Sequence, residues 1–438
     1  MRFVALAVFA SAIAAQSQTP ALFELPPPTG QSPIGTTRWV VTDRSRDETF
    51  APGRKRDIEV IAWYPAGPPS RPKAAMARSR RSSPDSARAE ADGAGRAGGE
   101  NPTSGPYLRD GMEEVLSFAR LAKLGEAFNG LASVKTHATL DAPPASSPAR
   151  LPVIVFQHGY TGLPSSHTAL MEDLASHGWA VLNVIHPYEA TGARLADGTV
   201  VTFTDDKNAM RAGIMEVLNE WGPEGGTMDK ITAAADDGEK EQLMRGNLAK
   251  LKNTDQVVKR WTLDVTHVLD HLPKDDAPGR LAARLDLTRL GAAGHSMGGV
   301  VAAQFCVKDR RCKAALNLDG IPQYGTIIDT PMAAPMLMVY SARPGRAGAS
   351  DIIYRRSASK YYRVDVTDTL HLDFTDMNFW GGPLRQRGAY GKIEPARAAE
   401  TTRLVVREFF AQEILKQPSP LLSSKMPMSG VTVTEFRK

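Results

Sequence analysis

Near-continuous apolar runs alternate with amphipathic segments along much of the chain. The runs LPVIVFQ, residues 151–157, and WAVLNVI, residues 179–185, are typical of strands buried on both faces of a parallel sheet. Between them, HTALMEDLASHG over residues 167–178 has the spacing of an amphipathic helix and ends at a glycine. Strands that alternate with helices predict an α/β protein with a mostly parallel sheet, in which function concentrates at the carboxyl ends of the strands.

The same pattern extends to both sides of this unit. It predicts further helices over residues 107–133, 256–272, 297–308 and 401–415, and strands over residues 57–64, 287–294, 313–318, 335–341 and 361–366. A polar, mostly helical excursion over residues 187–251 interrupts the alternation, and we expect it to form a cap that roofs the site. Residues 416–438 are expected to be a C-terminal tail.

The excess of positive charge is concentrated in one segment. The formal net charge of the chain is +5, and residues 67–106 carry seven Lys or Arg side chains against four acidic ones. This segment has no aromatic residue and a single large aliphatic side chain, Met76. We predict a disordered low-complexity insertion, because so little apolar surface cannot offset the entropy of ordering. A nucleic-acid-binding arm is not expected, because no aromatic side chain could stack on bases.

The amino-terminal residues indicate export. A positive start at Arg2 precedes an apolar run of about a dozen residues and small residues at Ala12 and Ala14, which predicts a secretory signal over residues 1–15. We therefore expect a secreted or periplasmic protein. The two cysteines, Cys306 and Cys312, could pair in an oxidising compartment, but their spacing alone does not decide between a disulfide and two thiols.

The stretch GHSMGG, residues 294–299, lies between a predicted strand and a predicted helix. A serine in such a sharp turn needs flanking residues without Cβ atoms, because the backbone on either side comes close. Gly294 and Gly298 meet this requirement around Ser296. The pattern G-x-S-x-G in this context predicts a nucleophilic serine at the amino end of a helix.

A serine hydroxyl becomes a nucleophile only when a base removes its proton. In this type of sheet the order along the chain is serine, acid, histidine, and His371 is the one histidine that follows Ser296. Two carboxylates could orient it. Asp319 directly follows a predicted strand and is favoured, while Asp351 stays open as the alternative.

Attack on a carbonyl also requires donors for the oxyanion. We expect one to be the N–H of Met297, which follows the serine, and the other the N–H of Tyr160 in the loop HGYTG. His267 and His271 lie four residues apart on one helical face, but no clear third ligand accompanies them. We therefore expect a structural face there, and neither a metal nor a cofactor.

Several motifs resemble one known family. LPVIVFQHGYTG with LASHGWAVLNVIHP, followed by GHSMGG, ALNLDG and HLDFTD, is similar to the α/β-hydrolases of the platelet-activating factor acetylhydrolase family, of the plasma and intracellular type II kind. The opening segments TGQSPIGTTRWVVTD and DIEVIAWYPA resemble the first strands of that family. The resemblance covers residues 29–415, which we take as one α/β-hydrolase domain that carries the insertion at 67–106.

The resemblance implies a set of site residues. The nucleophile of the family falls on Ser296, its acid on Asp319 and its base on His371, while its oxyanion donors fall on Tyr160 and Met297. It also implies a serine hydrolase that needs no cofactor.

The implied substrates are small-molecule or lipid esters, with short or oxidised acyl groups such as those at the sn-2 position of phospholipids. One alternative is a cutinase-like polyester hydrolase or general carboxylesterase, which would place the acid one strand later, at Asp351. Another is a catalytically silent protein that binds a lipid or ester. A weak contact with a membrane surface is a further hypothesis, through the charged insertion or through the apolar helix over residues 107–133.

Overall fold

The computed structural model of the protein describes residues 20–67, 104–222, 224–320, 325–423 and 425–436. The strands are β1 (Ile34–Asp47), β2 (Lys55–Pro65), β3 (Ser104–Pro106), β4 (Lys135–Leu140), β5 (Leu151–Gln157), β6 (Ala180–Ile185), β7 (Ala193–Arg194), β8 (Val200–Val201), β9 (Leu285–His295), β10 (Cys312–Leu318), β11 (Met336–Tyr340), β12 (Tyr361–Val366) and β13 (Val431–Phe436). The α-helices are α1 (Glu113–Leu121), α2 (Thr168–Ser176), α3 (Ala212–Trp221), α4 (Glu224–Ala233), α5 (Asp237–Leu248), α6 (Lys252–Asp270), α7 (Asp276–Ala282), α8 (Met297–Lys308), α9 (Asp351–Ser357), α10 (Gly382–Gln386) and α11 (Pro395–Leu415). Short 3₁₀ helices are η1 (Asn129–Ser133), η2 (Pro164–His167), η3 (His371–Phe374) and η4 (Asp376–Trp380).

The centre of the sheet is parallel, as the alternating pattern predicts. Its strands lie in the order β13-β12-β11-β10-β9-β5-β6-β2-β1-β4-β3. From β12 to β6 every neighbouring pair is parallel, whereas β2 and β13 join this block in the antiparallel sense. The carboxyl ends of the parallel strands therefore meet at one edge, which is where a site is expected.

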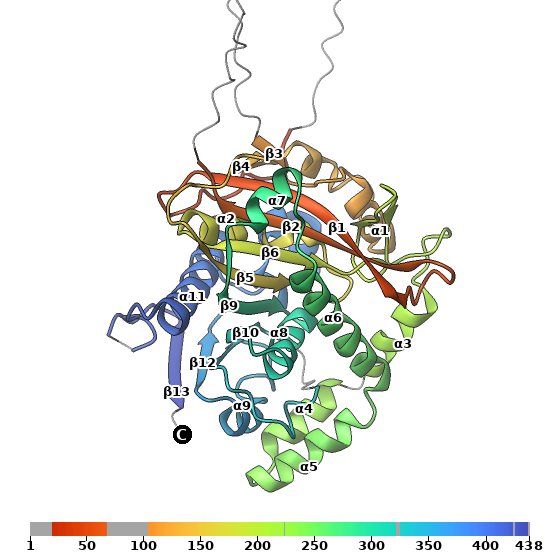
Figure 1. The fold of residues 1–438 in the computed structure, drawn as a ribbon. Coiled ribbons are helices and arrows are strands. Elements are labelled where there is room, and N and C mark those ends of the chain that lie inside the picture. The colour runs from red at the N-terminus through yellow and green to blue at the C-terminus, as the bar shows by residue number, and fades with distance from the viewer. Residues whose placement is uncertain (1–19, 68–103, 223, 321–324, 424, 437–438) are drawn as a thin grey trace, which may run out of the picture.

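Helices cover both faces of the sheet (Figure 1). Successive residues of β5 point to opposite faces: Val153 and Val155 pack in one core with side chains of α6 and α8, while Ile154 and Phe156 pack in a second core with side chains of α2 and α11. Because both faces are buried, the strand reads as a continuous apolar run rather than an alternating one. This explains why its boundaries could be predicted from the sequence.

The helix predicted over residues 107–133 is wrong in its length. The structure has the nine-residue α1 and, after a break, the short η1. In the segment between α1 and η1, Lys123 and Gly125 have φ angles of 52° and 53°. This left-handed conformation ends a helix. Apolar residues recur at helix-like intervals on both sides of this break, and the sequence pattern therefore predicted one longer helix.

The apolar side chains of this region face inward. Val115, Phe128 and Leu131 are at most 1% exposed and belong to a third core that also contains Trp380 of η4. These three side chains are therefore part of the core, and contact of this region with a membrane stays a prediction. Within the described residues, no helix is both long and apolar enough to cross a membrane.

The ends of the predicted domain differ from expectation in two places. The expected tail over residues 416–438 contains β13, which adds an antiparallel edge strand beside β12. The last residues of the expected insertion, Ser104–Pro106, form β3 at the opposite edge of the sheet. Residues 68–103 of that insertion, and the signal predicted over residues 1–15, lie outside the described residues.

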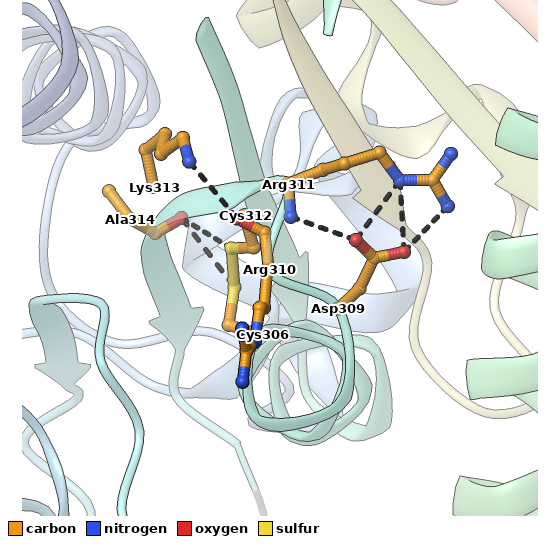
Figure 2. Close-up of a disulfide and its surroundings, with 7 residues drawn as sticks. All are labelled: Cys306, Asp309, Arg310, Arg311, Cys312, Lys313 and Ala314. Atoms are coloured by element: carbon orange, nitrogen blue, oxygen red, sulfur yellow. Dashed lines mark hydrogen bonds and ion pairs between the residues drawn. A yellow bond between two sulfur atoms is a disulfide. The ribbon is translucent and has the colours of Figure 1, made fainter. Parts of the chain in front are cut away.

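A disulfide connects α8 to the following strand (Figure 2). Cys306 and Cys312 are bonded, with their Cα atoms 5.0 Å apart, and both side chains are buried. In the turn between them, the Asp309 carboxylate accepts hydrogen bonds from the backbone N–H and the guanidinium of Arg311. The disulfide thus ties the helix that follows Ser296 to the strand that leads to Asp319.

Candidate active site

Ser296 lies in a tight turn between β9 and α8. Its φ of 57° and ψ of −122° are a strained conformation for a residue with a side chain. A Cβ at Gly294 would come within 2.2 Å of the Gly298 carbonyl carbon, and one at Gly298 within 2.1 Å of the Gln157 carbonyl oxygen. The two glycines of the motif are therefore required by the close approach of backbone, as the sequence predicts.

Strand pairing brings Asp319 next to this turn. Leu318, the last residue of β10, is in register with His295 of β9, and its carbonyl accepts a hydrogen bond from the Ser296 N–H at 2.9 Å. Asp319 follows at once, with a φ of 50° that turns the chain away from the strand. Sequence-distant strands thus place the serine and the carboxylate side by side at the edge of the sheet.

His371 reaches the same edge from the loop after β12. Its Nδ1 lies 2.7 Å from Oδ2 of Asp319, and Oδ1 of the carboxylate accepts the N–H of Ser341 at 3.0 Å. Burial alone would raise the pKa of Asp319, but the hydrogen bond and charge of His371 and the charge of Arg343 outweigh it and lower that pKa. The carboxylate is therefore ionised and can hold the imidazole with Nδ1 protonated.

His295, the residue before the serine, supports the histidine loop. Its Nε2 lies 2.9 Å from the backbone carbonyl oxygen of His371, and the two rings are 4.4 Å apart. Burial, followed by the charge of His371, holds the pKa of His295 well below its usual value, so the ring is neutral and Nε2 donates. Sequence reasoning missed this role, because its one signal was adjacency to the serine.

Ser296 and His371 line one cavity of about 180 Å³. Gly159, Tyr160 and the serine turn form one side. The remaining wall is mostly apolar, with these side chains: Val115, Phe118, Leu163, Leu372, Met377 and Trp380. The apolar cover therefore comes from α1 and η4, and the excursion over residues 187–251 that was expected to roof the site contributes Thr191 to the lining.

The loop after β5 approaches the serine closely. A Cβ at Gly159 would lie 3.2 Å from Cβ of Ser296. The loop is held from the other side, since the Thr161 N–H donates to the Glu189 carbonyl oxygen at 2.9 Å. Within the described part of the chain, the N–H groups of Tyr160 and Met297 have no hydrogen-bond acceptor.

The alternative acid is engaged elsewhere. Asp351 begins α9, where its Oδ1 accepts the hydroxyl of Tyr361 at 2.6 Å and its Oδ2 accepts from Arg363 at 3.1 Å. His267 and His271 stack on each other, with ring centres 4.0 Å apart. In the part of the chain that the structure describes, no group of three or more His, Cys, Asp or Glu side chains could hold a metal ion.

Comparison with known proteins identifies the family. The model of "Platelet-activating factor acetylhydrolase, isoform II" matches residues 106–415. The chain belongs to this family. A platelet-activating factor acetylhydrolase from Cavia porcellus is 24% identical over 298 residues, which is 65% of this chain. The match spans 62% of the length of that relative.

A solved structure is also similar. A ferulic acid esterase from Streptomyces cinnamoneus superposes with a TM-score of 0.65 at 25% identity, over 94% of this chain and all of the esterase chain. The large, mostly parallel sheet with helices on both faces is thus that of an α/β-hydrolase.

Proposed function

We propose that the protein is a serine carboxylic-ester hydrolase, with Ser296 as nucleophile, His371 as base and Asp319 as the carboxylate that orients the base. The observation that carries this proposal is the 2.7 Å contact between His371 and Asp319 beside the strained serine turn, with serine and histidine in one cavity. The family membership and the esterase neighbour support ester hydrolysis as the reaction class.

The proposed reaction has two halves. In the first, Oγ of Ser296 bonds to the ester carbonyl carbon while its proton passes to Nε2 of His371. The N–H groups of Tyr160 and Met297 hold the resulting oxyanion, a contribution of about 3 kcal/mol for each donor. The carbon–oxygen bond to the alcohol then breaks, and the alcohol leaves with the proton from His371. In the second half, water replaces the alcohol and releases the acid by the same steps.

The size of the cavity favours esters of small acids. An apolar cavity of about 150 Å³ holds a benzene molecule, so the 180 Å³ beside Ser296 suits a short acyl chain or a single aromatic ring. The first class includes short or oxidised acyl groups at the sn-2 position of a phospholipid. The second is favoured by the aromatic wall of Phe118 and Trp380 and by the similarity to a ferulic acid esterase.

Labelling with a fluorophosphonate probe tests the nucleophile. We expect mass spectrometry to find the label on Ser296, and the Ser296→Ala variant to be unlabelled and inactive toward p-nitrophenyl acetate. Asp351→Asn should keep full activity, as the matched control for Asp319→Asn. Activity that survives Ser296→Ala would contradict the proposal. A folded wild-type protein that neither takes the label nor hydrolyses esters would be a silent binding protein.

A substrate series tests the acyl group. We expect kcat/KM to be high for acetyl and butyryl esters of p-nitrophenol and to fall steeply toward dodecanoyl. Methyl ferulate and an acetylated phospholipid analogue, assayed side by side, separate the two substrate classes. A preference for the longest chains would rule out the proposed small acyl site.

Export is the remaining part of the proposal. The residues that start the chain resemble a secretory signal, and a bonded Cys306–Cys312 pair suits an oxidising compartment. Amino-terminal sequencing of the protein from its natural host should find a mature start near residue 16. Recovery of the uncleaved chain from the cytoplasm would contradict export.

A further inference from the structure

The carboxylate of Asp319 holds a second cationic partner besides the histidine. Nη2 of Arg343 lies 2.5 Å from Oδ2, the same oxygen that faces Nδ1 of His371 at 2.7 Å. The same Nη2 also lies 3.4 Å from the backbone carbonyl oxygen of Asp319. One carboxylate oxygen is therefore shared between an imidazole and a guanidinium that stays charged at any working pH.

The arginine follows the carboxyl end of β11, at the same edge of the sheet as Asp319 and His371. Its Nε donates to the hydroxyl of Ser341 at 3.2 Å while the N–H of Ser341 bonds to Asp319. The side chain is 25% exposed, and Arg343 is not among the described residues that line the cavity. Arg343 contacts Asp319 directly, and through that carboxylate it can influence His371.

Two other histidines near this pair are neutral, and a further carboxyl lies on the loop of His371. His295, from the end of β9, is neutral because burial and the charge of His371 hold its pKa well below its usual value. Burial lowers the pKa of His167, from η2, to about 3, so it is neutral too. Asp373, on the loop of His371 itself, has its pKa raised by burial and bonds to the backbone N–H groups of Leu370 and Gly391.

We propose that Arg343 is a positioning residue that keeps Asp319 ionised and, by taking part of the charge on Oδ2, limits how strongly the pair stabilises a protonated His371. This inference rests on the proposed function. Its consequence is that the base stays unprotonated, and the enzyme active, at a lower pH than an unshared Asp–His pair would allow. The effect follows because a cation beside an imidazolium disfavours its protonation.

The pH dependence of kcat/KM for p-nitrophenyl acetate tests this role. In Arg343→Met we expect the acid limb of the profile to move to higher pH by about one unit. Removal of one charge beside a partly exposed ion pair changes the interaction energy by about the equivalent of one pH unit. Arg343→Lys should lie close to wild type. Arg363→Met is the matched control, since it removes the same charge from a residue that pairs with Asp351 and Asp365, and its profile should not move.

A second measurement separates this inference from the proposed function. NMR titration of the His371 imidazole needs no catalysis, and it should show protonation at higher pH in Arg343→Met than in wild type. A profile and a titration that superpose on wild type, or that move to lower pH, would overturn the role of Arg343. Loss of the proposed function would appear instead as activity that survives Ser296→Ala.

Discussion

Two buried carboxylates in this protein have the same two kinds of partner, a histidine and an arginine. At the edge of the sheet, Asp319 binds the imidazole of His371 and a guanidinium on one oxygen. On the buried face of α6, Oδ2 of Asp264 binds Nδ1 of His186 at 2.8 Å and Nη2 of Arg56 at 2.7 Å, again on one oxygen. The two groups share this arrangement on Oδ2, whereas Oδ1 accepts from Arg46 in the Asp264 group and from the N–H of Ser341 in the Asp319 group.

Their surroundings differ. His186 is fully buried and stacks on Trp261 with ring centres 3.9 Å apart, whereas the side chain of His371 is 26% exposed and lines the cavity. Burial lowers the pKa of His186, so the ring stays neutral within its ion network. The Asp264 group therefore joins α6 to β2 and to the end of β6. Of the two Asp–His pairs, the one that we propose for catalysis is the one that adjoins the strained serine turn and the cavity.

The largest expected effect separates the two groups by activity. Asp319→Asn should lower kcat by about 10⁴-fold, because the amide no longer holds the imidazole in the productive tautomer. The circular dichroism spectrum should stay close to that of wild type, which shows that the variant is folded. Steady-state kinetics on a short ester measures the effect. A loss below tenfold would mean that Asp319 does not orient the base.

The matching change in the second group should act on stability instead. Asp264→Asn removes one buried counter-charge from Arg56 and Arg46, which keep Glu48 and Asp43 as partners. Breaking one buried pair should cost about 3 kcal/mol of unfolding free energy. Urea unfolding measures that loss. The kcat of the protein that remains folded should change by less than a few-fold. A catalytic loss as large as that of Asp319→Asn would erase the distinction between the two groups.

Glu114 is a third buried acid, and it shows how burial acts on a carboxyl group that, in the described part of the structure, has no cationic side chain in hydrogen-bond contact. Among the described residues, Glu114 accepts hydrogen bonds from the N–H of Asp110 and the hydroxyl of Ser165, and burial raises its pKa to about 8. The neutral folded form contributes stability below the ordinary value of 4.5, and that contribution is lost as the pH rises toward 8. The unfolding free energy of wild type should therefore decline over this range more than that of Glu114→Gln. Parallel curves would contradict a neutral Glu114.

The smallest expected effect concerns the cavity beside Ser296 and His371. Phe118→Ala removes an aromatic side chain from the cavity wall. It should raise kcat/KM for hexanoyl relative to acetyl esters by about tenfold, because each methylene that the cavity can accommodate contributes about 1–3 kcal/mol to transition-state binding. Leu263→Ala, an exposed position on α6, is the control. An unchanged ratio would place the acyl group elsewhere.

The sequence was most informative where the determining forces are local. The turn itself requires Gly294 and Gly298. The strands of the parallel block can be recognised in the sequence as apolar runs, because both of their faces are buried. The chain order of Ser296, Asp319 and His371 could be proposed from these elements alone, and the structure brings the two latter side chains together.

Other features depended on contacts between distant parts of the chain. The arginine at Asp319, the support from His295, the apolar cover by α1 and the edge strand β13 have no local pattern, because each arises where strands pair or side chains meet across the fold. The residues alone determined an α/β sheet with a serine turn at a strand end. Tertiary structure decided which of two similar Asp–His pairs adjoins that turn, since register and helix packing set the distances between side chains.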